Sequence, residues 1–160
     1  MAQTSVKGWV LSYKELGDID HLYSRANSIL NEARTQLRSF NYDLAVRRAQ
    51  EALELYIKTT FRFTGTEYPK SHDIEKRIYE VWQLLAEYDV TREEVARMVL
   101  ANTTTSAWRS PSFYGDERLG VARLFRQKEA EVAIGYAEEV RNICEKVRSH
   151  LYRRAAGAKG

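Results

Sequence analysis

The chain has 160 residues, of which 44% are hydrophobic and 29% are charged, a length and composition that favour one globular domain and exclude a disordered or fibrous chain. Its apolar runs span only a few residues, which excludes a transmembrane helix of about 20 apolar residues, so we expect no membrane association. A net charge of +3 is too small to choose between nucleic acid and an acidic protein as the binding partner.

The N-terminal segment MAQTSVKGWVLSYKEL lacks the basic start, the apolar run and the small-residue cleavage site of a secretion signal. The single cysteine, Cys144, cannot form an internal disulfide, which is typical of proteins in a reducing compartment. We therefore expect a cytoplasmic protein with one helical domain over residues 1–160. Its core is expected at about residues 18–154, between a flexible N-terminal arm and a flexible C-terminal tail.

Apolar residues at spacings of three and four predict a first helix over about residues 20–38 and a second that ends near Phe63. Asn41, in the short turn between them, is expected to cap the second helix with its side chain. So short a turn predicts that the two helices form an antiparallel hairpin. Gly65 is expected to end the second helix in the left-handed conformation.

A third helix is expected to follow Pro69, with Ser71 as its N-cap and an apolar stripe that ends at Leu85. Thr91 and Glu94 form the pattern of a capping box at the start of a short fourth helix.

Residues 102–120 are rich in turn formers and are interpreted as a long ordered loop, a kind of segment that often has a function. The last helix is expected over about residues 125–154, followed by a frayed tail. The sequence therefore predicts an all-α, up-and-down bundle of four to five helices.

The segment AQEALELYIKTTFRFTG of the second helix contains Glu54 and Lys58, four residues apart in the order that favours an ion pair. The structural interpretation is a solvated surface pair, which would contribute only about 0.2–0.5 kcal/mol. The segment NYDLAVRRAQEAL also resembles a tetratricopeptide unit. That interpretation requires a repeat of about 34 residues, and no such repeat occurs.

A more extensive pattern follows the first half of the chain: Asn41-Tyr42-Asp43, Ala49-Gln50, Ala52, Glu54, Lys58, Gly65, Pro69 and Ser71-His72-Asp73-Ile74. In order and spacing these residues resemble the N-terminal half of the HEPN family, over about residues 20–80. The resemblance implies an HEPN-like helical bundle that is frequently a homodimer. Members of the family occur as partners of minimal nucleotidyltransferases, as modules fused into larger proteins, and as RNA-cleaving toxins.

The RNA-cleaving HEPN members share an arginine that precedes a histidine with four to six residues between them. No arginine stands at that spacing before His21, His72 or His150. The standard motif is absent, so the prediction leans toward a protein that is not an enzyme. The alternative is a metal-independent RNase in which a displaced pair, Arg141 or Arg148 with His150, holds the phosphate and moves protons.

Two further sets of residues have both a functional and a structural interpretation. His72 and Asp73 are expected at the start of the third helix, where they either line a binding cleft or cap and orient the helix. Trp108, Arg109 and Tyr114 combine aromatic rings with a cation, a composition that stacks on nucleobases or anchors a partner. The structural interpretation is that the aromatic rings close one end of the bundle.

Three separated histidines and one cysteine give no ligand spacing for zinc, and no glycine-rich phosphate loop occurs, so no metal and no cofactor are expected. Cys144 lies on the apolar stripe of the last helix and is expected to be buried and unreactive.

The leading hypothesis is a non-catalytic, homodimeric HEPN-type module that binds a minimal nucleotidyltransferase partner or a nucleotide or RNA ligand. The residues expected to bind the ligand or partner are Glu54, Lys58, His72, Asp73, Trp108, Arg109 and Tyr114. The RNase is the first alternative. A plain RNA-binding domain, whose affinity would fall steeply with salt, is the second.

Overall fold

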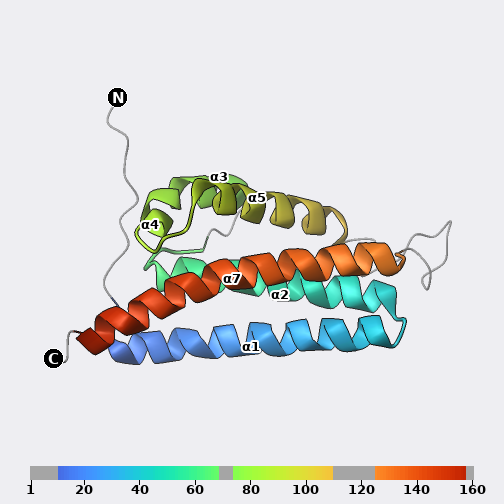
Figure 1. Cartoon of the computed structure of the whole chain (residues 1–160), viewed down its shortest axis with the longest axis horizontal. Coiled ribbons are helices and arrows are strands. Elements are labelled where there is room, and N and C mark those ends of the chain that lie inside the picture. The colour runs from blue at the N-terminus through green and yellow to red at the C-terminus, as the bar shows by residue number, and fades with distance from the viewer. Residues whose placement is uncertain (1–10, 69–73, 110–124, 158–160) are drawn as a thin grey trace.

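The computed structural model describes residues 11–68, 74–109 and 125–157, which form six α-helices and no β-strand. The helices are α1 (Tyr13–Arg38), α2 (Tyr42–Phe63), α3 (Ile74–Glu80), α4 (Trp82–Ala86), α5 (Arg92–Ala107) and α7 (Gln127–Gly157). In Figure 1 the long helices α1, α2 and α7 run alongside one another, and α3, α4 and α5 lie together on one side of them. The predicted all-α bundle is confirmed. None of these helices has the length and apolar composition needed to cross a membrane.

The central helix of the bundle is α2, because it packs extensively against both α1 and α7. Its fully buried small residues, Ala45, Ala49 and Ala52, allow neighbouring helices to approach closely. Leu53 and Tyr56, also fully buried, fill the space between the helices. Burial of a large apolar side chain stabilises the folded state by roughly 1.5–3 kcal/mol, so the bundle depends on this helix.

The predicted antiparallel hairpin of α1 and α2 is confirmed (Figure 1). Asn41 stands at the N-cap of α2, but its side chain does not cap the helix and instead donates to Gln36 Oε1 at 2.9 Å. The cap predicted for Asn41 is therefore wrong, because a neighbouring glutamine competes for the amide. Gly65 has a φ of 71°, so its predicted left-handed conformation after α2 is confirmed.

The first helix begins at Tyr13, well before the predicted start near residue 20. Ser12 and Glu15 form a capping box, in which Glu15 N donates to Ser12 Oγ at 3.2 Å and Ser12 N donates to Glu15 Oε2 at 2.6 Å. Leu16 and Ile19 extend the buried stripe into this first part of the helix. The helix start predicted from the sequence was too late, because it did not take the capping box and these two buried residues into account.

The predicted loop over residues 102–120 is wrong at its beginning, because α5 continues through Ala107 and has 16 residues. Two interactions satisfy the turn-forming side chains within the helix. Thr105 Oγ1 donates to the Ala101 carbonyl at 2.8 Å, and Asn102 Nδ2 donates to Glu75 Oε1 of α3 at 3.2 Å. The fourth helix is therefore not short, and residues 110–120 lie outside the described part of the chain.

The predicted third helix is divided into α3 and α4 at Val81. Helical hydrogen bonds nevertheless continue across the division, from Val81 N to the Arg77 carbonyl and from Leu85 N to the Val81 carbonyl, both at 3.1 Å. The division is therefore a local distortion. The predicted cap, Ser71, lies outside the described residues. The last helix continues to Gly157, so part of the predicted frayed tail is helical.

A partly buried ion pair joins α1 to α7. Arg148 Nε donates to Asp20 Oδ1 at 2.5 Å, and a second guanidinium nitrogen donates to Oδ2 at 3.2 Å. The guanidinium also lies 5.2 Å from the ring centroid of Tyr23 and 5.0 Å from that of Tyr152. Two-point hydrogen bonding with aromatic contact restrains the orientation of Arg148, and so sets the position of α7 against α1.

Replacing Arg148 by Met is expected to lower the free energy of unfolding by about 1.5–3 kcal/mol, because Asp20 then loses both hydrogen-bond donors in a partly buried position. Urea denaturation followed by circular dichroism measures the change. Arg153→Met is the control, since Arg153 is exposed further along α7 and its replacement is expected to cost less than about 0.5 kcal/mol. Equal effects would contradict a stabilising role for the Asp20–Arg148 pair.

Two glycines are expected to respond in opposite ways to substitution by alanine. Gly65→Ala should destabilise the fold by about 1–2 kcal/mol, because a Cβ is strained at a φ of 71°. Gly17→Ala should stabilise it by roughly 0.8–1.0 kcal/mol, because Gly17 lies inside α1 and an added Cβ meets nothing within 4 Å. Thermal and urea unfolding of both variants test the two signs, and destabilisation by Gly17→Ala would contradict this account of α1.

Candidate functional site

A row of polar residues follows α2 at intervals of four: Gln50, Glu54, Lys58 and Arg62. We refer to these four residues as the polar row. Four residues turn an α-helix by about 400°, so each member is displaced by about 40° around the helix from the one before. The polar row thus winds from Glu54, which faces Arg109 beyond the end of α5, to Arg62, which lines a pocket beside α1.

Glu54 and Arg109, two residues predicted to form the site, are brought together by the fold. Arg109 Nη1 lies 3.6 Å from Glu54 Oε2, and Gln50 Nε2 donates to the same oxygen at 3.1 Å. The predicted Glu54–Lys58 surface pair is not present, because Glu54 interacts with Arg109 and Gln50. Lys58 is exposed and makes no ion pair within the described residues.

Two buried polar atoms of this region have no hydrogen-bond partner among the residues that the structure describes. They are Gln50 Oε1, in a side chain only 3% exposed, and the hydroxyl oxygen of Tyr68. Such an atom costs roughly 1–3 kcal/mol when it is removed from water and left unpaired. Native proteins contain few of them, so each one requires an explanation. A ligand that supplies a donor to Gln50 and a partner to Tyr68 would provide it.

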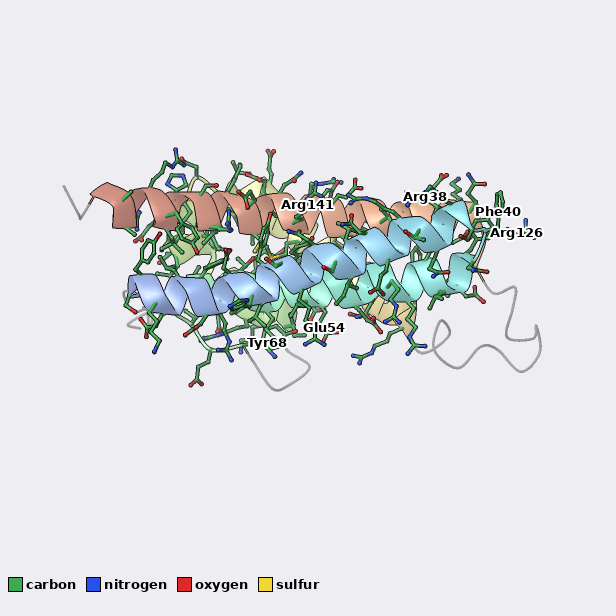
Figure 2. All side chains as sticks on the ribbon, turned by 90° about the horizontal axis from the view of Figure 1, so that it is seen from below. Arg38, Phe40, Glu54, Tyr68, Arg126 and Arg141 are labelled. Atoms are coloured by element: carbon green, nitrogen blue, oxygen red, sulfur yellow. The ribbon has the colours of Figure 1, made fainter. Side chains whose placement is uncertain are left out.

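The electrostatic environment of Tyr68 links it to the same residues. The pKa of Tyr68 is raised to about 12, mainly by burial and in part by the negative charge of Glu54, while the positive charge of Arg109 opposes the rise. Its ring packs edge-on against Phe61 of α2, with centroids 5.7 Å apart. Figure 2 shows Glu54 and Tyr68 projecting on the same side of the α1–α2 pair, away from α7. Tyr68 is therefore a neutral phenol held next to the Glu54–Arg109 pair.

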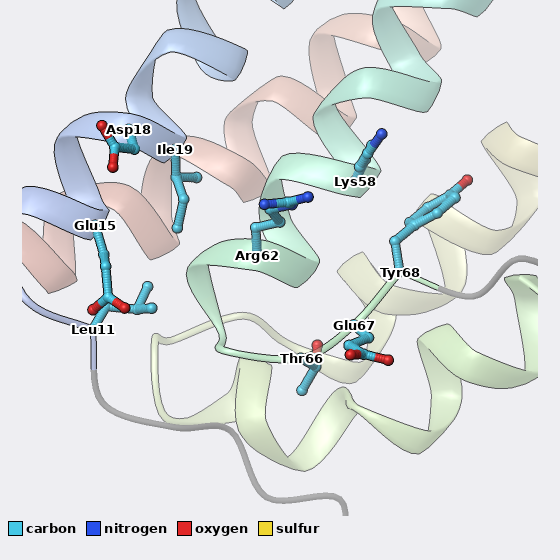
Figure 3. A pocket seen from close by; sticks show the side chains of 9 residues that line it. All are labelled: Leu11, Glu15, Asp18, Ile19, Lys58, Arg62, Thr66, Glu67 and Tyr68. Atoms are coloured by element: carbon cyan, nitrogen blue, oxygen red, sulfur yellow. The ribbon is translucent and has the colours of Figure 1, made fainter.

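Lys58 connects this cluster to two pockets. Together with Glu54 it lines one of about 620 Å³, and together with Tyr68 it lines another of about 610 Å³. In Figure 3 the side chains of Lys58 and Arg62 stand between residues of α1 and the segment that contains Tyr68. The predicted residues Glu54, Lys58 and Arg109 thus occupy one region of the surface.

Trp108 takes the structural position considered from the sequence. Its half-buried ring packs against Phe125, with centroids 5.7 Å apart and an interplanar angle of 51°. The Phe125 amide in turn donates to Asp43 Oδ1 at 2.8 Å, which joins the chain two residues before α7 to the start of α2. Trp108 therefore closes this end of the bundle. The other predicted residues, His72, Asp73 and Tyr114, lie outside the described part of the chain.

Sequence reasoning did not select Gln50 and Tyr68 as binding residues. Gln50 carried a usable signal, because it stands one helical turn before Glu54 in the polar row. Tyr68 carried none, since its place beside Glu54 depends on the path of the chain after Gly65.

A model of the HEPN domain family matches residues 19–147, which is most of the chain. The chain belongs to the HEPN family. No curated protein matches it. The matched range begins in α1, ends in α7 and contains the polar row, Tyr68 and Arg109, so the candidate site is part of the HEPN domain itself.

The displaced pairs considered for an HEPN RNase do not converge within one chain. His150 stands nine positions after Arg141, which places the two residues on opposite faces of α7 and about 13.5 Å apart along its axis. His150 Nε2 lies 3.0 Å from Asp89 Oδ2, whereas the charge of Arg141 acts on Tyr56, where it opposes the rise in pKa caused by burial. Arg148 is bound to Asp20.

The described residues provide no site for metal binding or for a reactive thiol. No group of three or more His, Cys, Asp or Glu side chains there is arranged to hold a metal ion. Cys144 is fully buried, and burial raises the pKa of its thiol to about 12. The reactive thiolate is therefore scarce at neutral pH.

Substitutions of the neighbouring residues Trp108 and Arg109 distinguish a side chain that stabilises the fold from one that is a candidate for binding. Trp108→Ala is expected to reduce the free energy of unfolding by roughly 2 kcal/mol, less than the 3–5 kcal/mol typical of a fully buried ring. Arg109→Ala is expected to change it by less than about 0.5 kcal/mol, because 58% of the side chain is exposed. Urea denaturation measures both, and a stable Trp108→Ala variant would contradict the end-closing role.

Proposed function

We propose that this HEPN domain is a non-catalytic binding module of the cytoplasm that forms a homodimer and binds a nucleotide or RNA at the Gln50–Glu54–Tyr68–Arg109 cluster. The observation that supports binding is that two buried polar atoms, Gln50 Oε1 and the Tyr68 hydroxyl, have no partner within the described part of the chain, in the region of the Glu54–Arg109 pair. Nucleobase edges present hydrogen-bond donors and acceptors close together, which is the complement that these two atoms require.

The charged members of the cluster suit the phosphate of such a ligand. Arg109 is a planar donor with a fork geometry that matches phosphate, and its contact with Glu54 at 3.6 Å is long for a charge-assisted hydrogen bond. A phosphate group would compete with Glu54 for Arg109, and both side chains are more than one third exposed, where an ion pair contributes little to stability. Lys58, one turn along α2, supplies a second cation.

The absence of catalysis is proposed because no described histidine lies near this cluster. His150 of α7 interacts with Asp89, which lies in the turn before α5. His21 lies on the exposed face of α1. General acid–base cleavage requires a proton-transfer group within hydrogen-bond reach of the ribose hydroxyl. The region supplies binding groups, and the RNase alternative gains no support from it.

Membership of the HEPN family is the support for the homodimer and for a minimal nucleotidyltransferase as protein partner. Multi-angle light scattering of the purified chain tests the dimer directly. A monomer at working concentrations would contradict that part of the proposal and would leave the nucleotide site of each chain in place.

The proposed site predicts that Tyr68→Phe weakens binding without weakening the fold. We expect about a tenfold loss of affinity, or roughly 1.4 kcal/mol, because the ligand loses one hydrogen bond. The free energy of unfolding should stay constant or rise, since the substitution removes a buried hydroxyl that has no partner. Fluorescence polarisation with a labelled single-stranded RNA, and calorimetry with ATP, measure affinity in metal-free buffer.

Tyr79→Phe is the matched control, because Tyr79 is 47% exposed on α3 and its hydroxyl can be hydrated. Equal affinities of the wild type and Tyr68→Phe, or no binding of either probe by the wild type, would contradict the proposed site. Cleavage of the RNA, followed on denaturing gels, would contradict the non-catalytic assignment.

A further inference from the structure

A pocket of about 610 Å³ lies at the end of the α1–α2 hairpin opposite its turn, between the start of α1 and the end of α2 (Figure 3). We call it the hairpin-base pocket. Its volume is within the range of roughly 300–1,000 Å³ that is typical of small-molecule sites. The charged side chains that line it are Glu15, Asp18, Lys58, Arg62 and Glu67.

The two helices of the hairpin supply charges of opposite sign to this pocket. Glu15 and Asp18 are three residues apart on α1, so they share one face of that helix. Lys58 and Arg62 are four residues apart on α2 and share a face in the same way. In Figure 3 the two carboxylates project from α1 and the two cations from α2. The third carboxylate, Glu67, belongs to the segment that follows α2.

These opposite charges do not pair with one another. No nitrogen of Lys58 or Arg62 lies within 4.0 Å of a carboxylate oxygen of any described residue. Asp18 and Glu67 are exposed, and neither makes an ion pair within the described part of the chain. Glu15 is already engaged, because its Oε2 accepts the Ser12 amide at 2.6 Å. The pocket therefore presents unpaired charges of both signs.

The balance of charge selects the kind of ligand that fits. Three carboxylates line the pocket against two cations, so a ligand that carries only negative charge meets net repulsion. A ligand that carries only positive charge leaves Lys58 and Arg62 without a partner and is repelled by them. A ligand with one ammonium and one carboxylate meets an opposite charge at each end.

The rest of the lining is partly apolar. Leu11 and Tyr68 are half-buried and Ile19 is buried, and all three line the pocket beside the charged residues. An apolar ligand side chain in contact with them is removed from water, which favours binding. An amino acid with an aliphatic side chain combines an ammonium, a carboxylate and an apolar group in one small molecule.

We propose that the hairpin-base pocket binds a small zwitterion, an amino acid or short peptide with an aliphatic side chain. Its carboxylate binds Arg62, whose planar guanidinium matches a carboxylate with two parallel hydrogen bonds. Its ammonium binds Asp18 across the pocket. This site is additional to the proposed nucleotide site: the ring of Tyr68 borders both, whereas Asp18 and Arg62 line only the pocket.

Three probes with the same side chain test whether both charges of the ligand are needed. L-leucine carries both charges, N-acetyl-L-leucine only the carboxylate, and L-leucinamide only the ammonium. NMR chemical-shift titrations of the whole chain measure the three affinities. We expect leucine to bind about fivefold more tightly than either analogue, which is the contribution of one exposed ion pair. Equal affinities, or no binding of leucine, would overturn the proposal.

Two variants of the pocket give a test of sign. Asp18→Asn and Arg62→Gln are each expected to weaken leucine binding about fivefold, because each removes the partner of one ligand charge. A simple anion would instead gain affinity from Asp18→Asn, and a simple cation would gain it from Arg62→Gln. A gain in affinity for leucine in either variant therefore overturns the zwitterion.

Glu93→Gln and Arg92→Gln are the matched controls, since both residues are exposed on α5 and lie outside the pocket. They are expected to leave the affinity for leucine unchanged. Urea denaturation of all four variants checks that the fold is retained. Equal losses in the controls and in the pocket variants would overturn the assignment of leucine to this pocket.

Leucyl-leucine distinguishes the two sources of the zwitterion. Tighter binding of the dipeptide than of leucine supports the pocket as a site for short peptides, and weaker binding supports it as a site for a free amino acid. Leucine binding by a chain that binds neither ATP nor RNA would support the pocket and contradict the proposed function. Binding of ATP or RNA without binding of leucine or leucyl-leucine would overturn the pocket alone.

Discussion

The packing of α2 between α1 and α7 is the constraint on which the rest of the structure depends. Its alanines bring both neighbouring helices close, and its larger residues fill the core between them. Once two sides of α2 are buried, polar residues can occupy only the strip that remains. From Glu54 onward the polar row follows that strip, and its drift of about 40° per step carries it from Arg109 to the pocket beside α1 that Arg62 lines. The site is thus a geometric consequence of the packing of α2.

Charge pairing decides which residues of this surface are free to bind. Arg48 pairs with Glu32 and Glu51, and Glu51 also pairs with Arg47, whereas Arg25, Lys58 and Arg62 make no ion pair among the described residues. The small net charge of the chain conceals this local difference.

Ion pairs also fix α7 against the helices on either side of it. Toward α5, Lys146 binds Glu94 at 2.7 Å and Arg97 binds Glu139 at 2.5 Å. Toward α1, Arg148 binds Asp20 with two hydrogen bonds. The pairs toward α5 contribute little energy individually, whereas the Asp20–Arg148 pair is partly buried. All three are directional, and apolar packing is not. They set how α7 is oriented between α1 and α5, and so help to position the ends of α5 and α7 where Trp108 meets Phe125.

The sequence by itself determined the all-α class, the α1–α2 hairpin and the end of α2 before Gly65, because helical periodicity and helix-ending glycines are local signals. The order and spacing of the motif residues in the first half of the chain gave the resemblance to the HEPN family, which the family model matches. Local signals also misled: Thr105 and Asn102 suggested a loop, but contacts with Ala101 and Glu75 keep them helical. Only the tertiary structure decided that Glu54 meets Arg109, that Tyr68 lies near them, and that His150 interacts with Asp89. Those relations join residues far apart in the sequence, or depend on how a helix is turned against its neighbours, and no local pattern encodes either.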